Sequence, residues 1–313
     1  MACSNATIQT AGGIHLLGDT DRVLMHEHIF NRYPYSRQRE MEEFVLRELN
    51  AAHKQGITVI CDLTAYTKPY NYYNVIENSP VKIVSCVGFY TSRYIPEQVK
   101  RQGHDSLIRT YGRMIEKGVG SRRIKPGILK IAAQSHILSP LEKKLFSVVA
   151  HLSREYGLPI ALHAPKGTLS HVCSLISEGA NPNKIFAAHI ESGITIESEF
   201  EKRITEAAQI MKLGSYIQLS DFGCTVSSVK REAGLRFIEE LIRNGYLSHL
   251  LLSGDSCWRW KNDKFVVKEY NHCNGKHYTY TIDSTISMIK EKLCFADIDS
   301  VLLLENPGHL FST

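Results

Sequence analysis

The chain has 313 residues, of which 43% are hydrophobic and 22% are charged, and its formal net charge is +5. These values are ordinary for a globular protein, exclude a disordered chain, and predict a single domain over residues 1–313. No apolar run reaches about 18 residues, and the first residues lack a basic region followed by an apolar stretch, so we expect neither a membrane span nor a signal peptide.

Apolar, strand-like runs recur along the whole chain, and they end near His28, Leu63, Tyr90, Lys130, His163, His189, Leu219 and Ser253. Segments with helical periodicity follow at 40–55, 105–117, 140–156, 169–177, 196–213, 230–244 and 282–293. Parallel strands need crossovers of this length, so eight strand–helix units over roughly 250 residues predict an α/β fold, a (β/α)8 TIM barrel. The alternative is a doubly wound open sheet, which would leave the first and last strands apart.

Six metal-type residues stand at the ends of these runs, namely His26, His28, Lys130, His163, His189 and Asp255. Because the carboxyl ends of barrel strands meet at one face, the positions predict a metal cage there. Each residue has an ordinary alternative: a hydrogen-bonded core histidine, a lysine whose head reaches the rim, or a turn aspartate. Together these alternatives would require six independent coincidences of position.

The chemistry of these residue types supports the cage. His26 and His28 are two apart, so strand alternation predicts both on one face and Glu27 on the other. Lys130 lies in the apolar run GILKIAA, where a buried ammonium is costly and tends to lose its proton. A neutral amine can take up carbon dioxide and become a carbamate, whose two oxygens can bridge two metal ions. Imidazole and carboxylate ligands suit zinc, with manganese and cobalt as alternatives.

These motifs match a known family. From IQTAGG through HEH, GFY, ILK, ALH, AAH and SGD to LENPGHLF, the chain resembles the phosphotriesterase family of the amidohydrolase superfamily, in particular the phosphotriesterase-like lactonases. The resemblance implies two divalent metal ions, with zinc expected, and a homodimer. It assigns the more buried metal to His26, His28 and Asp255, the more exposed one to His163 and His189, and the bridge to N6-carboxylated Lys130 and a hydroxide. The hydroxide would attack the substrate, and Asp255 would deliver a proton to the leaving group.

Other residues bear on the substrate. Tyr90 matches a position where lactonases carry a tyrosine near the metals, although it could be a core aromatic. Cys257 is expected to line the pocket, or else to be a plain buried thiol. Organophosphate-degrading members carry an acidic relay after strands six and seven. Here Glu191 keeps that character in part, and Ser220–Asp221 replaces the aspartate–arginine step of lactonases, which weakens a phosphotriester assignment.

The long segment 257–280 after strand eight is basic: its five lysines and arginines less its two acidic residues leave +3. It is either a solvated loop or a lid that captures an anion. We expect substrate contacts from Tyr90, Cys257, Arg259, Lys268, Lys276 and Tyr278. The patch is too local to predict nucleic-acid binding.

The predicted function is a metal-dependent hydrolase that opens lactones of small anionic, phosphorylated sugars. The alternatives are an organophosphate triesterase or an amide hydrolase on the same two metals. A non-catalytic binding protein would be expected to have lost part of the ligand set, which is complete here. The eight cysteines show no CxxC pair and no framework spacing, so free thiols favour a reducing, cytoplasmic setting.

Overall fold

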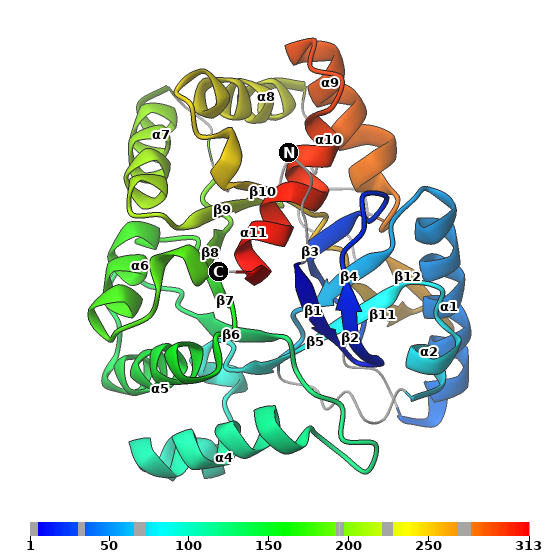
Figure 1. Ribbon diagram of the computed structural model, residues 1–313, viewed down its shortest axis with the longest axis vertical. Helices are drawn as coiled ribbons and strands as arrows, with labels where there is room; N and C mark the ends of the chain where they lie inside the picture. The colour runs from blue at the N-terminus through cyan, green and yellow to red at the C-terminus, as the bar shows by residue number, and fades with distance from the viewer. Residues whose placement is uncertain are drawn as a thin grey trace.

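The computed structural model describes residues 6–30, 35–65, 73–191, 194, 197–220, 228–267 and 277–312. Within these residues, one sheet has eight parallel strands whose spatial order follows the chain. They are β3 (Val23–Glu27), β4 (Val59–Asp62), β5 (Lys82–Gly88), β6 (Ile128–Ala132), β7 (Ile160–His163), β8 (Ile185–Ala188), β9 (Tyr216–Leu219) and β10 (Leu250–Leu252). The residues after β10 return to β3, where the Asp255 amide donates to the His26 carbonyl at 3.0 Å. The TIM barrel is confirmed, and the doubly wound alternative is wrong (Figure 1).

Helices surround the sheet (Figure 1). The α-helices are α1 (Gln38–Lys54), α2 (Tyr73–Asn78), α3 (Glu97–Arg101), α4 (His104–Lys117), α5 (Pro140–Tyr156), α6 (Thr168–Ser177), α7 (Glu197–Lys212), α8 (Ser228–Arg243), α9 (Ser287–Leu293), α10 (Ile298–Ser300) and α11 (Asn306–Ser312). Short 3-10 turns lie at Tyr35–Arg37, Ser92–Tyr94, Pro182–Lys184 and Leu247–His249, and π-helical segments at Thr281–Ile286 and Val301–Glu305. The segment predicted as one helix over 282–293 is therefore a π-helical turn followed by α9.

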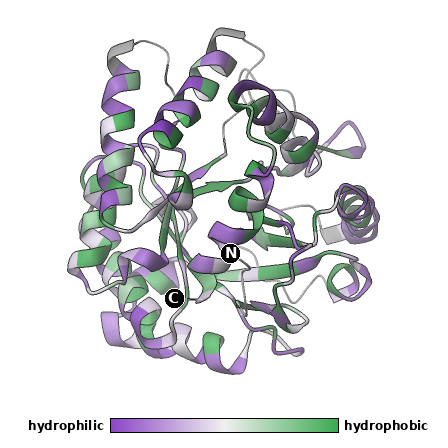
Figure 2. Ribbon diagram, turned by 45° about the horizontal axis from the view of Figure 1, so that its top comes forward, coloured by the Kyte–Doolittle hydropathy of each residue, from purple (hydrophilic) through white to green (hydrophobic). Residues whose placement is uncertain are grey.

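Two apolar layers form the core. One lies between the sheet and the helices, and the other fills the barrel interior with side chains such as Met25, Cys61 and Phe186. The strands are correspondingly the most apolar part of the molecule, while the helices carry their polar residues outward (Figure 2). Cys61 and Cys86 are buried in β4 and β5. In the described part of the chain, no helix is long and apolar enough to span a membrane.

The amino ends of the strands are covered by a hairpin of β1 (Thr7–Thr10) and β2 (Gly13–Leu16) together with α11 (Figure 1). The Ala11 amide donates to the Ile83 carbonyl at 2.7 Å, near the start of β5. On the other side, Lys184 Nζ donates to the Phe311 carbonyl at 3.1 Å, just before β8. The hairpin and α11 thus leave the opposite end, where the strands finish, for the predicted metal-type residues.

A second hairpin follows the eighth barrel strand and is formed by β11 (Trp258–Lys261) and β12 (Lys264–Val267). Its aromatic face packs on α1, with the Phe44 and Trp258 ring centroids 5.2 Å apart and those of Phe44 and Phe265 6.0 Å apart. The first part of the segment predicted as a basic loop or lid is therefore a docked hairpin. The positions 268–276, with Lys268 and Lys276, lie outside the described residues.

Candidate metal centre

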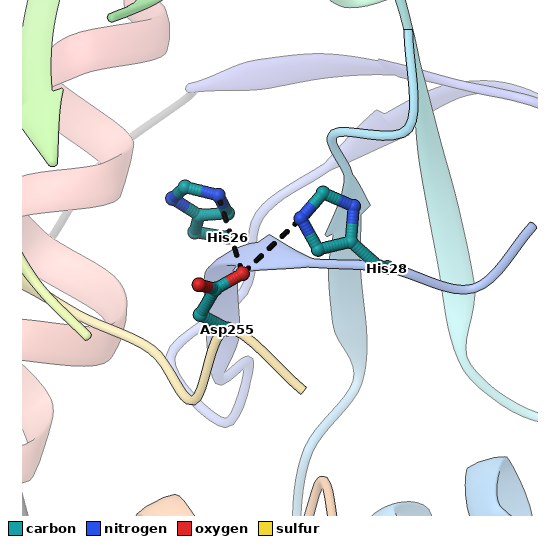
Figure 3. Close-up of side chains that lie close together, drawn as sticks. All are labelled: His26, His28 and Asp255. Carbon is teal, nitrogen blue, oxygen red and sulfur yellow. Dashed lines mark ion pairs between the residues drawn. The ribbon is translucent and has the colours of Figure 1, made fainter. Parts of the chain in front are cut away.

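Three of the predicted ligands meet at the carboxyl ends of the strands (Figure 3). Asp255 Oδ1 lies 3.1 Å from His28 Nε2 and 3.6 Å from His26 Nε2. One ligand atom from each of the three residues lies within 4.8 Å of the others, a spacing that suits a single metal ion. Asp255 comes from a turn three residues beyond β10, as the turn alternative had it, but its carboxylate faces the histidines (Figure 3).

A bulge in β3 turns both histidines inward. Leu24 pairs with Ile60, but the next pair is Glu27 with Asp62, so β3 uses three steps where β4 uses two. Strict alternation from Met25, which lies in the interior cluster, would have aimed Glu27 at the barrel axis instead. One extra residue reverses the facing of every later side chain. The prediction that the histidines share one face is confirmed, and the bulge is the reason that this face is the inner one.

The histidine rings are held through their Nδ1 atoms. His26 Nδ1 lies 2.9 Å from Gln218 Oε1, and His28 Nδ1 lies 2.9 Å from Thr64 Oγ1. His189 Nδ1 lies 2.9 Å from Ser220 Oγ. A partner on Nδ1 fixes ring orientation and leaves Nε2 as the ligand atom, which is the usual arrangement around a protein-bound metal. This donor set therefore fits a divalent metal ion.

The second pair of predicted ligands lies beside the first group. The His163 and His189 rings are 4.6 Å apart, and His189 Nε2 lies 3.9 Å from Asp255 Oδ2. Tyr90, just after β5, packs against His163 with ring centroids 5.3 Å apart, so its ring lies beside this pair of histidines. All of the predicted ligands therefore converge on one face of the barrel.

Lys130 lies beside the first group, in the middle of β6 rather than at its end. Its side chain is only 1% exposed, and Nζ lies 3.5 Å from His26 Nε2. The alternative of a lysine head that reaches the rim is therefore wrong. Gly88 permits this packing: a Cβ at that residue would lie 2.0 Å from the Lys130 carbonyl oxygen, and its φ of +139° disfavours other residues.

Burial changes the protonation of the site. It lowers the pKa of Lys130 to about 8, so a substantial fraction of the amine is neutral near physiological pH. Burial, together with Lys130, holds the pKa of His26 well below its ordinary value; burial, together with His189, does the same for His163. Burial works to raise the pKa of Asp255, but the interactions with the neighbouring histidines, among them a hydrogen bond from His28, outweigh it and hold that pKa well below its ordinary value. Neutral imidazoles, an ionised carboxylate and a partly neutral amine are the forms that metal binding and carbamate formation require.

The predicted substrate residues divide by burial. Cys257 is buried, and Arg259 is half-buried on the β11–β12 hairpin. Tyr278 is fully buried and packs edge-on against Trp258, with ring centroids 4.8 Å apart. A substrate-binding role for Tyr278 does not fit this position, because the ring belongs to the packing that supports the hairpin.

Sequence reasoning missed the residues that hold the ligands. Gln218, Thr64 and Ser253 are buried polar side chains at the ends of apolar strands. Buried polar groups need partners, so their positions beside the ligand-bearing strand ends were a usable signal. Which ligand each of them holds depends on the barrel closure and could not be read from spacing.

The sequence model of the phosphotriesterase family matches residues 6–311. The chain belongs to the phosphotriesterase family. It is 23% identical to the phosphotriesterase homology protein of Escherichia coli (strain K12) over 276 residues, covering 86% of this chain and 88% of that protein. It is 25% identical to an aryldialkylphosphatase of Saccharolobus solfataricus over 315 residues, covering 94% of this chain and 96% of that protein. Members of this family hydrolyse ester bonds with a binuclear metal centre, and this chain is accordingly an ester hydrolase of the metal-dependent class.

Two solved structures share the fold. One, described as "Molecular Engineering of Organophosphate Hydrolysis Activity from a Weak Promiscuous Lactonase Template", superposes with a TM-score of 0.82 at 18% identity, covering 98% of this chain and all of that one. The other is the Escherichia coli phosphotriesterase homology protein with phosphate in its active site, with a TM-score of 0.78 at 21% identity, covering 95% of this chain and 100% of that one. Both support the barrel fold of this phosphotriesterase-family protein.

Proposed function

We propose that this phosphotriesterase-family protein is a metal-dependent lactonase that opens small anionic, phosphorylated sugar lactones. The observation that carries the proposal is the convergence of His26, His28, His163, His189 and Asp255 around buried Lys130. We further propose that two divalent ions, with zinc expected, occupy this centre and that carbamylated Lys130 joins them. Support comes from the burial of Lys130, which keeps part of its amine neutral, the form that reacts with carbon dioxide.

The bound metals would supply a hydroxide near neutral pH and polarise the carbonyl oxygen of the substrate. Burial raises the pKa of Tyr90 to about 12, so its hydroxyl stays protonated and can donate a hydrogen bond to that oxygen. Asp255 accepts the proton of the attacking water and passes it to the ring oxygen as the carbon–oxygen bond breaks. The product is the open hydroxy acid.

An anionic substrate is favoured by the charge of the segment after the eighth strand. Arg259 lies four residues beyond Asp255, and Lys261 and Lys264 follow on the same hairpin. On β11 and β12, Trp258, Trp260 and Phe265 face α1, so the basic residues alternate onto the other face. Lysine and arginine side chains at a cleft edge suit phosphate or carboxylate groups.

The first test is a pH-indicator hydrolysis screen of metal-loaded protein on matched sugar lactones, each with and without a terminal phosphate. We expect at least tenfold higher kcat/KM for the phosphorylated member of a pair, because one charge-assisted contact contributes about 1.5–3 kcal/mol. Equal turnover of both members would contradict an anion site, and no turnover of any lactone would contradict the lactonase proposal.

A phosphotriesterase is the second candidate, because the Saccharolobus relative is an aryldialkylphosphatase. Against it stands the altered acidic relay: Glu191 Oε1 accepts a hydrogen bond from the Ser220 amide at 2.6 Å, so this carboxylate is engaged by backbone. Paraoxon hydrolysis faster than that of any lactone would favour the triesterase.

The proposed compartment is the cytoplasm. In the described residues, Cys61, Cys86, Cys173, Cys257 and Cys294 are free thiols, which suits a reducing environment.

A further inference from the structure

The barrel closes at a seam between β3 and the turn 253–256 that follows β10. The Asp255 amide donates to the His26 carbonyl at 3.0 Å, and the His28 amide donates to the Ser256 carbonyl at 2.9 Å. The His26 amide donates to Ser253 Oγ at 2.9 Å. The seam therefore joins the metal-type residues of the first strand to the turn that carries the aspartate.

Glu27 sits inside this seam with no exposed surface. Its Oε1 accepts from Ser253 Oγ at 2.7 Å and from the Gly254 amide at 2.6 Å, and its Oε2 accepts from the Ser256 amide at 2.7 Å. Glycine leaves room for this approach, because a Cβ at Gly254 would lie 3.2 Å from Glu27 Oε1 and 2.7 Å from Ser256 Oγ. One carboxylate thus holds the residues on both sides of Asp255.

The backbone of Asp255 needs such support. Its φ is +50°, in the left-handed region that residues other than glycine seldom adopt. In this conformation the carboxylate spans the centre, with Oδ1 3.1 Å from His28 Nε2 and Oδ2 3.9 Å from His189 Nε2. A small rotation of the turn would move both oxygens away from the imidazoles.

We propose that Glu27 is a positioning residue for the metal centre: its carboxylate fixes the 253–256 turn so that Asp255 faces the histidines. The inference rests on the proposed metal centre and adds a residue that ligates nothing itself. The β3 bulge makes this role possible, because the same extra residue that turns the histidines inward turns Glu27 toward the seam. The β3 bulge therefore determines the orientation of the two histidines and, through Glu27, the position of Asp255.

Glu27→Gln is the sharpest variant because it keeps the shape of the side chain. An amide has only one acceptor oxygen, so in either orientation its NH2 group faces at least one of the three donors. Groups that orient ligands typically change metal affinity by about ten- to hundredfold when they are lost. We expect Glu27→Gln to weaken binding of Zn²⁺ by that factor, measured by competition with a chromogenic chelator. Ser253→Ala, which removes one donor, should weaken it less.

The matched control is Asn306→Leu. Asn306 is equally buried, and its Nδ2 donates to the Leu247 and Leu250 carbonyls at 2.8 and 2.7 Å, at the other end of β10. Both variants should lower the melting temperature of the metal-free protein, but only Glu27→Gln should lower Zn²⁺ affinity. The double variant Glu27→Gln with Ser253→Ala should weaken binding by less than the product of the single effects, because the two groups act on one turn.

The outcomes separate the two proposals. Wild-type protein that binds no Zn²⁺ would overturn the metal centre and the positioning role together. Wild-type binding with unchanged affinity in Glu27→Gln would overturn the positioning role alone. If Glu27→Gln does not fold, unchanged affinity in Ser253→Ala is the result that overturns it. An equal loss of Zn²⁺ affinity in Asn306→Leu would also overturn the positioning role, because Glu27 would then act only by stabilising the barrel.

Discussion

At Lys130 the chain places an amine where an ammonium ion is costly. The side chain is 1% exposed in the middle of β6, and burial lowers its pKa to about 8. Lys130 Nζ lies 3.5 Å from Nε2 of His26, an imidazole whose pKa is held well below its ordinary value by burial. The proposed carbamate would replace this costly positive charge with a negative one beside the metal ions.

Lys130→Ala should therefore remove at least one metal ion per chain and lower kcat/KM by about 100-fold or more, since bridging charge contributes several kcal/mol. A short carboxylic acid such as propionate should restore part of both, because it can occupy the space of the carbamate. Metal content and turnover of the purified variant check the prediction. Lys184→Ala is the control: Lys184 is also buried, but it binds the Phe311 carbonyl at the opposite end of the barrel. Full activity in Lys130→Ala would rule out the carbamate.

At the scale of single residues, the sequence predicted which metal-type side chains meet at the barrel face but not which groups hold them. The alternation of HEH indicated that His26 and His28 share a face, and the structure adds the bulge that makes it the inner one. Such a bulge has no signature in VLMHEH, because it depends on how β3 pairs with β4. The partners Gln218 and Thr64 come from other strands for the same reason.

Among the elements, the β11–β12 hairpin was predictable from its sequence pattern, although the segment was not predicted as a hairpin. Trp258 and Trp260 alternate with Arg259 and Lys261 before Asn262–Asp263, and an apolar, strand-like run at 265–267 follows that pair. Both central residues have positive φ, as the tightest hairpin turns require. Asparagine and aspartate tolerate that conformation, so the pair was a usable turn signal. The basic charge of the segment instead favoured a solvated loop or an anion-capturing lid.

Helix prediction was best where local chemistry fixes the ends. The predicted segment 140–156 coincides with α5, because Ser139 and Glu142 form a reciprocal capping box and Pro140 occupies the first turn. The predicted segment 282–293 begins instead with a π-helical turn at Thr281–Ile286. The periodicity of apolar residues does not distinguish one π-helical turn from an α-helical one.

The segment after the hairpin is tied back to α1 by an ion pair, and this pair should make stability depend on pH. His277 Nδ1 lies 2.5 Å from Glu48 Oε2, and this hydrogen bond raises the pKa of His277 above its ordinary value of 6.5. The folded state binds the proton more tightly, so the stabilisation is complete below pH 6.5 and is lost as pH rises through the raised pKa. Because the His277 side chain is 55% exposed, we expect only about 0.2–1 kcal/mol.

His277→Gln should accordingly lower the free energy of unfolding at pH 5.5 more than at pH 9, as measured by urea denaturation. His53→Gln, an exposed change on the same helix, serves as the control and should show no such difference. An equal loss at both pH values would mean that His277 contributes by packing rather than by charge.

On the scale of the molecule, the proposed metals would connect elements that are far apart in the chain. The ligands come from β3, β6, β7, the end of β8 and the turn after β10. A ligand that binds only the folded state stabilises it by about 4 kcal/mol when present at a thousandfold excess over its Kd. Dialysis against a chelator should therefore lower the melting temperature by several degrees, and added Zn²⁺ should restore it. Identical melting curves with and without chelator would contradict a metal centre in the native protein.

The barrel itself was predictable because each strand–helix unit repeats the same physics: a buried apolar strand, a crossover helix and a right-handed return. Closure was inferred from chemistry, since His26 and Asp255 had to meet. The coverings of the barrel were not predicted. The β1–β2 hairpin and α11 bury Ile8 and Leu310 against the interior layer. The sequences of these short segments do not indicate which end of the barrel they cover.

The covering of the amino end restricts how substrate enters the barrel and how product leaves it. The amino end of the barrel interior is filled by apolar side chains, namely Ile8, Leu17, Leu304 and Leu310. In the described part of the barrel, the candidate metal centre therefore lies at the opposite, carboxyl end. Substrate must then enter and product must leave at the same end of the barrel, so bound product blocks the binding of the next substrate until it is released. If the basic residues of the β11–β12 hairpin bind an anionic reactant, as proposed, they would bind an anionic product as readily. In such an enzyme we expect product release, as well as bond breaking, to limit kcat.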